Sequence, residues 1–118
     1  MMIRILDREN DTLLNKFIAQ MRDVGVQGDS MRFRRNLERI GEVMAYEISK
    51  TLDYSVKDIQ TPLGTAPTLL YNDPIVLGTI FRAGLPFHQG FLNVFEEADN
   101  AFVSAYRFYK DKECHEVG

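Results

Sequence analysis

The sequence lacks the residues that would support a disulfide framework, a metal site or a membrane span. Its 118 residues include one cysteine, Cys114, and two histidines, His88 and His115. A single cysteine excludes an internal disulfide, and the adjacent Cys114 and His115 cannot close a tetrahedral zinc site without further ligands. No apolar run reaches the ~18 residues that a membrane-spanning helix needs. The composition therefore predicts a soluble protein of a reducing compartment, the cytoplasm.

The sequence also has no excess of positive charge. The chain has 14 Lys and Arg against 17 Asp and Glu, so its formal net charge is -3. This balance argues against a nucleic-acid binder and against a protein that docks on anionic membranes. Hydrophobic residues make up 45% of the sequence, which is enough for a modest core in one domain of this length. No internal repeat, low-complexity tract or interdomain linker interrupts the sequence.

Two segments in the first half of the chain have helical periodicity. Residues 11–23 place apolar side chains at helical spacing behind Asp11, which is a suitable N-cap. Residues 31–52 carry a longer apolar stripe, and either Ser30 or Asp29 is expected to cap it. The stripe consists of Phe33, Leu37, Ile40, Met44, Ile48 and Leu52.

Strand and helix signals alternate in the second half. Residues 54–64 predict a short strand that ends in a turn with Pro and Gly, and residues 68–73 predict a further extended piece. Residues 74–81 form a continuous apolar run, typical of a strand covered on both faces in a parallel sheet. Residues 85–98 then predict a helix, and residues 100–111 a strand rich in Phe, Val and Tyr. A strand, a helix and a strand make a βαβ unit, so an α/β protein is predicted.

Arg82 stands where the apolar strand turns toward the helix. Ligands of open α/β sheets bind at this carboxyl edge of the strands. Ala83 and Gly84 would let a ligand approach the backbone closely, and the start of the following helix favours an anion. The planar guanidinium of Arg82 can donate two parallel hydrogen bonds to a phosphate-type group. From the residues alone, an ion pair with a neighbouring carboxylate is an equal alternative.

Arg107 is the second candidate for the same site. It alternates with Val103 and Ala105 on one face of the last predicted strand. A charge among apolar side chains needs a partner. That partner is either a ligand or one of the acidic residues Glu96, Glu97 and Asp99.

His88 lies early in the helix that follows Arg82. Histidine titrates near neutral pH, so a role in acid–base chemistry is conceivable. A hydrogen-bonded structural histidine is the favoured interpretation. No catalytic residue can be named from the sequence.

Four ordered motifs give the chain a family resemblance. They are FRRNLERIGEVMAYEISKTL (33–52), TPLG (61–64), IFRAGLPFHQGFLN (80–93) and NAFVSAYR (100–107). Together they resemble the N-terminal half of uracil phosphoribosyltransferases. One difference is Phe81, which stands where that family usually has Leu before Arg-Ala-Gly-Leu.

The resemblance implies that Arg82 and Arg107 contact 5-phosphoribosyl 1-diphosphate, with Ala83 and Gly84 as the supporting turn. It also implies the reaction, in which uracil and this substrate give uridine monophosphate and diphosphate in pyrimidine salvage. Mg²⁺ is expected with the full-length parent, although no metal ligand is expected from this chain itself. The implied partners are the two substrates and further copies of the chain, in a homodimer or higher homo-oligomer, without nucleic acid or membrane.

The resemblance also predicts a single incomplete domain over residues 1–118. Residues 1–54 are expected to form an N-terminal arm, with MIRIL (2–6) as a short strand or extended piece, and two helices. Residues 55–118 are expected to hold the first strands and helix of a type I phosphoribosyltransferase-like core and the outgoing half of a β-arm. The phosphoribosyl-binding loop and the uracil-binding segment do not occur in the sequence.

An amino-terminal fragment that is inactive by itself is therefore expected. Two alternatives stay open at this point. One is a non-catalytic module for dimerisation or for sensing phosphoribosyl diphosphate. The other is a phosphoribosyltransferase for another base, because base choice is expected to reside in the missing half.

Overall fold

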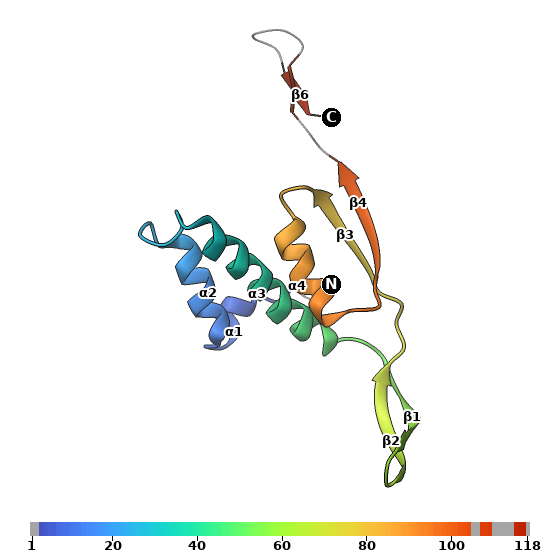
Figure 1. Ribbon diagram of the computed structural model, residues 1–118. Coiled ribbons are helices and arrows are strands. Elements are labelled where there is room, and N and C mark those ends of the chain that lie inside the picture. The colour runs from blue at the N-terminus through green and yellow to red at the C-terminus, as the bar shows by residue number, and fades with distance from the viewer. Residues whose placement is uncertain (1–2, 105–106, 110–114, 118) are drawn as a thin grey trace.

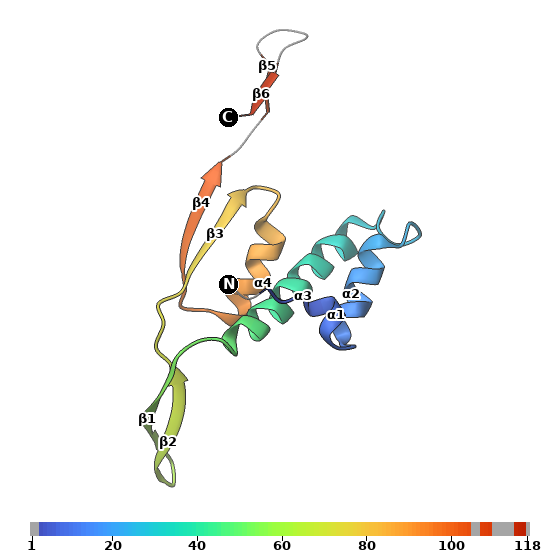
Figure 2. The ribbon, with the colours of Figure 1, turned by 180° about the vertical axis from the view of Figure 1, so that it is seen from behind.

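The computed structural model describes residues 3–104, 107–109 and 115–117, with side chains for residues 3–104. The helices gather beside one pair of parallel strands, and a β-hairpin extends from either end of this body (Figures 1 and 2). None of the helices in these ranges is long and apolar enough to cross a membrane. The helices are α1 (Leu6–Glu9), α2 (Leu13–Arg22), α3 (Ser30–Ser49) and α4 (Leu85–Val94). The strands are β1 (Tyr54–Thr61), β2 (Gly64–Tyr71), β3 (Val76–Phe81), β4 (Asp99–Ser104), β5 (Arg107–Tyr109) and β6 (His115–Val117).

Helices α2 and α3 confirm the two predicted helical segments, but one cap differs. The side chain of Thr12 caps α2 by accepting a hydrogen bond from the backbone N–H of Leu14 at 3.1 Å. Asp11, the expected cap, lies one residue too early for this role. Asp29 caps α3 as expected and accepts a hydrogen bond from the backbone N–H of Arg32 at 3.1 Å.

Helix α3 ends at Ser49, before residue 52 where the apolar stripe predicts its end. The hydroxyls of Ser49 and Thr51 donate to the backbone carbonyls of Tyr46 and Ile48 at 2.5 Å and 2.7 Å. Such side-chain hydrogen bonds compete with the next helical turn. The two hydroxyl residues therefore stop the helix although an apolar residue still follows.

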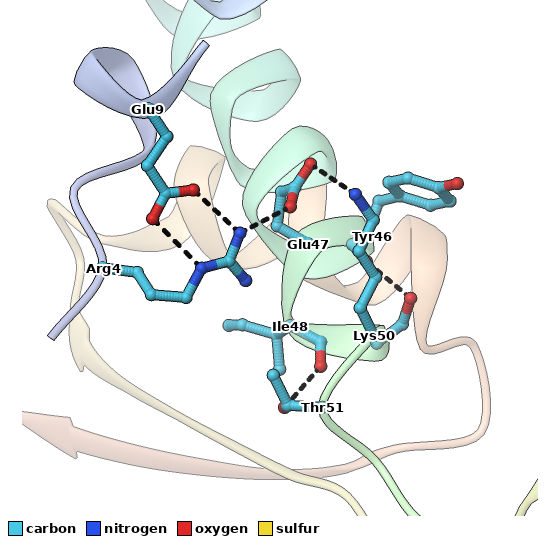
Figure 3. Close-up of polar contacts among 8 residues, drawn as sticks. Arg4, Glu9, Tyr46, Glu47, Ile48, Lys50 and Thr51 are labelled. Carbon is cyan, nitrogen blue, oxygen red and sulfur yellow. Dashed lines mark hydrogen bonds and ion pairs between the residues drawn. The ribbon is translucent and has the colours of Figure 1, made fainter. Parts of the chain in front are cut away.

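Of the two alternatives predicted for residues 2–6, the short strand is wrong where the structure describes it, whereas an extended piece agrees with the extended backbone of Ile5. Residues 3–5 have no regular structure, and Leu6 begins α1. The guanidinium of Arg4 donates to the carboxylate of Glu9 at 2.9 Å and 3.2 Å, and to that of Glu47 at 3.1 Å (Figure 3). Lys50 pairs with the other oxygen of Glu47 at 3.1 Å. Ion pairs with α3, and not strand pairing, therefore fix this segment.

Helices α3 and α4 cross at a point where both lack side chains. A Cβ added to Gly41 would lie 2.6 Å from the carbonyl oxygen of Phe87, and a Cβ added to Gly90 would overlap the carbonyl oxygen of Glu38. Glycine at both positions lets the two backbones touch. The core beside this crossing is small, and its buried apolar residues are Leu14, Ala45 and Phe95.

Strands β1 and β2 form an antiparallel hairpin that projects from the body (Figure 1). Its register runs from Tyr54 opposite Tyr71 to Thr61 opposite Gly64. Gly64 has a φ of +133°, a backbone conformation that side chains rarely permit. The hairpin confirms the strand predicted over residues 54–64, and the extended piece after it becomes the second strand.

Strands β3 and β4 confirm the predicted parallel pair, with α4 as the crossover between them. Val76 pairs with Asp99 at one end of the register, and Phe81 pairs with Ser104 at the other. The predicted α/β class and βαβ unit are thus confirmed, although this parallel sheet has only two strands within the described ranges.

The prediction that β3 is covered on both faces is wrong for this chain. Helix α4 packs on one face only, the one where His88 meets Asn100. On the opposite face, the side chains of Val76, Ile80 and Val103 are about three-fifths exposed, at 62%, 62% and 61%. The apolar run therefore indicates a strand with two faces that are both suited to burial. Within the described residues, α4 covers one of these faces.

The last predicted strand is divided, and its return is a further correction. β4 ends at Ser104 and β5 begins at Arg107, while the predicted alternation through Ala105 falls outside the described residues. His115–Val117 comes back antiparallel to Arg107–Tyr109, with Arg107 opposite Val117. The expectation of an outgoing half alone is therefore wrong, since the β-arm contains a returning strand.

Candidate anion-binding site

The candidate site is the turn that joins β3 to α4. It consists of Arg82, Ala83 and Gly84, and the peptide bond between Phe81 and Arg82 is cis. The backbone N–H of Gly84 donates to the carbonyl of Ile80 at 3.2 Å, and the N–H of Leu85 donates to that of Arg82 at 3.0 Å. These two bonds make a tight reversal directly at the end of the parallel strand.

Gly84 is needed for the packing beneath this turn. A Cβ at this position would overlap the hydroxyl of Thr79 and lie 3.0 Å from the carbonyl oxygen of Ile80. The sequence predicted a close approach at Gly84, but toward a ligand. In the structure, Gly84 packs closely against strand β3. The absence of a side chain at Gly84 therefore allows the turn to lie on this strand.

The side chain of Arg82 is exposed. Among residues 3–104, whose side chains the structure describes, Arg82 forms no ion pair and no side-chain hydrogen bond. The alternative of a neighbouring carboxylate therefore has no support in this part of the chain. None of its five N–H donors is used by a side chain of residues 3–104.

Helix α4 begins beside the same turn. Gly84 is its N-cap and offers no side-chain hydrogen bond, Pro86 lies in its first turn, and no acidic residue lies there either. Proline is well tolerated at this position, since its missing N–H would have no helical partner. The positive end of the helix dipole is thus not neutralised by its own side chains, which favours an anion near Arg82.

Arg107 follows the strand that pairs with β3. Phe81, the last residue of β3, pairs with Ser104, the last residue of β4, and Arg107 begins β5 soon after. Arg82 therefore lies at the carboxyl edge of the parallel pair, and Arg107 comes after the strand that ends at the same edge. The proposed acidic partners Glu96, Glu97 and Asp99 precede β4 or start it, at the opposite end of this strand.

His88 has the hydrogen-bonded, buried position that was favoured for it. Its side chain is only 8% exposed, and Nε2 lies 2.7 Å from Oδ1 of Asn100 on β4. Its ring also lies against Phe102, with 5.1 Å between the ring centroids. Sequence reasoning missed Asn100 and Thr79 as supporting residues. For Asn100 the available signal was a polar residue at the start of the predicted strand 100–111. For Thr79 it was a polar residue within the apolar run 74–81.

A separate apolar pocket of about 450 Å³ is lined by residues of β3, of α4 and of the end of α3. Arg82 does not line it, so the pocket and the arginine turn are different features. Its walls suit apolar packing and not an anion. The lining residues are Ile48, Pro74, Ile75, Val76, Leu77, Gly78, Thr79, Phe87, His88, Phe91 and Phe95.

The ranges described by the structure contain no group of three or more His, Cys, Asp or Glu side chains that could hold a metal ion. These residues therefore do not fit a Mg²⁺ site made by protein ligands alone. Any Mg²⁺ at the candidate site would need oxygen ligands from another source, such as a bound diphosphate.

Comparison with known proteins identifies the chain's relatives. The fold and the site define an α/β protein that presents an arginine and a helix start at a strand end. The AQ2163 protein from Aquifex aeolicus shares this fold, with a TM-score of 0.66 at 23% identity over 92% of this chain and 51% of that one. The model of the family described as uracil phosphoribosyltransferase matches residues 9–117. The chain belongs to the uracil phosphoribosyltransferase family.

Curated relatives agree with this family. Uracil phosphoribosyltransferase from Porphyromonas gingivalis is 60% identical over 101 residues, which is 86% of this chain and 47% of the relative. The protein of the same name from Methanothermobacter thermautotrophicus is 38% identical over 109 residues, or 91% of this chain and 48% of the relative. The chain thus spans about half the length of the curated relatives it matches.

Proposed function

We propose that the chain is part of a uracil phosphoribosyltransferase, which converts uracil and 5-phosphoribosyl 1-diphosphate to uridine monophosphate and diphosphate in pyrimidine salvage. Its family supports this reaction, and the chemistry of the turn supports the anionic substrate. The observation that carries the proposal is the exposed guanidinium of Arg82, which stands next to a helix start without a side-chain cap and has no partner among the described side chains.

The proposed reaction exchanges one bond at the anomeric carbon of the ribose. The bond from this carbon to the diphosphate oxygen breaks, and the electron pair leaves with diphosphate. A ring nitrogen of uracil forms the new bond and loses its proton. Negative charge grows on the leaving group, so fixed cations that meet it lower the barrier. Arg82 is proposed to bind this diphosphate through two N–H donors, with Arg107 as a second cation and Ala83 and Gly84 as the supporting turn.

Three finer expectations belong to the same proposal. The full-length enzyme is expected to use Mg²⁺, which supplies charge neutralisation when it is bound with the diphosphate. It is expected in the cytoplasm. It is also expected to form a homodimer or higher oligomer, because large exposed apolar surfaces favour association. The exposed face of Val76, Ile80 and Val103 supports the need for such a cover.

The proposal is tested by substituting Arg82 in the full-length protein. Hydrogen bonds between charged groups contribute about 1.5–3 kcal/mol. We therefore expect Arg82→Ala to raise the KM for phosphoribosyl diphosphate roughly 10- to 100-fold. The control is Arg8→Ala, which removes an exposed arginine from α1, far from the turn in sequence. Uridine monophosphate formation and substrate binding are measured for each variant.

The outcomes separate the competing functions. Unchanged binding of phosphoribosyl diphosphate in Arg82→Ala would contradict the proposed site. Binding without product formation from any base would favour a sensing or dimerisation module, and product formation from a base other than uracil would favour a different phosphoribosyltransferase. The 118-residue chain alone is expected to bind the substrate very weakly and to form no measurable product.

A further inference from the structure

The hydrogen bond between His88 and Asn100 joins the two parts of the fold that lead to the two arginines. His88 lies on α4, and Asn100 lies on β4. Oδ1 of Asn100 accepts at 2.7 Å, so the hydrogen of the imidazole is on Nε2. His88 is only 8% exposed, whereas Asn100 is exposed, so the bond is half-buried. A hydrogen bond is directional, so it limits how far α4 can slide along β4 more than apolar contact alone would.

The backbone of His88 is tied to the arginine turn as well. Its N–H donates to the carbonyl of Gly84 at 2.9 Å, and the N–H of Gly84 in turn donates to the carbonyl of Ile80 at 3.2 Å. His88 therefore links Gly84, the last residue of the turn, to strand β4. A displacement of the His88 ring would move the first turn of α4, and the Arg82 turn moves with it.

Strand β4 connects the same bond to the second arginine. From Asn100 the strand continues to Ser104, which pairs with Phe81 directly before Arg82. Arg107 begins the next strand. The position of Ser104 beside the Arg82 turn is thus set at two levels, by the strand pairing at Phe81 and by the His88–Asn100 bond.

We propose that His88 and Asn100 are positioning residues for phosphoribosyl diphosphate. They touch no substrate, but they hold the Arg82 turn and the strand leading to Arg107 in the arrangement in which both can meet one diphosphate. This inference rests on the proposed function. It requires that losing the bond weakens substrate affinity, because the two cations no longer meet the ligand together, while the chemistry after binding is retained.

The test uses the full-length protein with variants that remove or keep the bond. His88→Phe and Asn100→Val remove it at similar volume, while His88→Gln and Asn100→Asp keep a donor or an acceptor. The matched control is Gln89→Ala, which removes an exposed hydrogen bond of 2.8 Å to Asn93 on the same helix. For each variant we measure kcat, the KM of both substrates, the melting temperature and direct calorimetric binding of phosphoribosyl diphosphate.

The removing variants are expected to raise the KM and Kd for phosphoribosyl diphosphate about five- to tenfold, as the loss of one hydrogen bond predicts. The KM for uracil and kcat should stay within about twofold. The double variant His88→Phe/Asn100→Val should be no worse than either single one, because both remove the same bond. Asn100→Asp or His88→Gln should restore most of the affinity.

Three results would overturn the positioning role. The first is a lower melting temperature with unchanged substrate affinity, which would make the pair purely structural. The second is an equal loss of affinity in Gln89→Ala, and the third is a fall in kcat alone. If the unmodified protein binds phosphoribosyl diphosphate but does not use uracil, the proposed function fails, while the binding series still decides the positioning role. If it binds no phosphoribosyl diphosphate, both fail.

Discussion

From the close crossing of α3 and α4, we predict that Gly90→Ala destabilises the protein, although alanine is the better helix former. A Cβ at Gly90 would overlap the carbonyl oxygen of Glu38 and lie 2.9 Å from both its carbonyl carbon and the backbone nitrogen of Glu42. These opposing atoms belong to the backbone of another helix, so no side chain can rotate away. The two helices would have to separate.

The magnitude follows from two opposing contributions. Overpacking of a well-filled contact costs about 1–3 kcal/mol, and a backbone-to-backbone clash belongs at the upper end. Replacing a helical glycine by alanine stabilises the helix by about 1 kcal/mol. The free energy of unfolding of Gly90→Ala should therefore fall by about 2 kcal/mol. At roughly 4 °C per kcal/mol for a domain of this size, the melting temperature should fall by about 8 °C.

Urea and thermal unfolding followed by far-ultraviolet circular dichroism measure this change. Gly28→Ala is the matched control, because a Cβ at Gly28 would meet nothing within 4 Å, and its stability should stay within about 0.5 kcal/mol of the parent. If Gly90→Ala were as stable as the parent or more stable, helix propensity would outweigh the clash. The inferred contact between the two backbones would then be wrong.

The ion pairs of α3 and its N-cap give two further predictions. Hydrogen bonds from Lys50 and then Arg4 lower the pKa of Glu47 below its ordinary value of 4.5. The stabilisation that this carboxylate provides is thus complete above pH 4.5 and is lost as the pH falls through the lowered folded pKa. Thermal melts from pH 7 to pH 3 should therefore show a shallower acid loss in Glu47→Gln than in the parent; equal slopes would contradict this. Asp29→Ala, which leaves the N–H of Arg32 without its cap, should cost about 1 kcal/mol in urea unfolding, and Asp29→Asn should restore most of it.

Features that depend on neighbouring residues in the sequence could be predicted well. The apolar stripe of α3 and its cap at Asp29 are local signals, and so is the apolar run that became β3. The helix ends were less accurate. Thr12 replaced Asp11 as a cap, and side-chain hydroxyls stopped α3 early. Both outcomes depend on which of several similar polar residues reaches a backbone group, and composition does not decide this.

Features that depend on distant residues could not be predicted. The sequence placed Arg82 at the end of a strand before a helix, and the structure has it there with its side chain exposed. It gave no sign that His88 would meet Asn100, or that Gly84 would press against Thr79. These contacts arise only when α4 folds back over β3 and β4. The role of Arg107 stays a prediction.

The parallel pairing of β3 and β4 also determines the order in which the protein can fold. Strand β1 meets β2 across the short turn between Thr61 and Gly64, whereas Val76 and Asp99 are separated in sequence by the rest of β3 and the whole of α4. Hairpins close within about 1–10 μs, while distant partners must first overcome the entropy of a long loop. Amides of β3 should therefore become protected later than those of β1 in pulsed hydrogen exchange. Within these residues, the segment that carries the proposed substrate contact is then organised later than the hairpin.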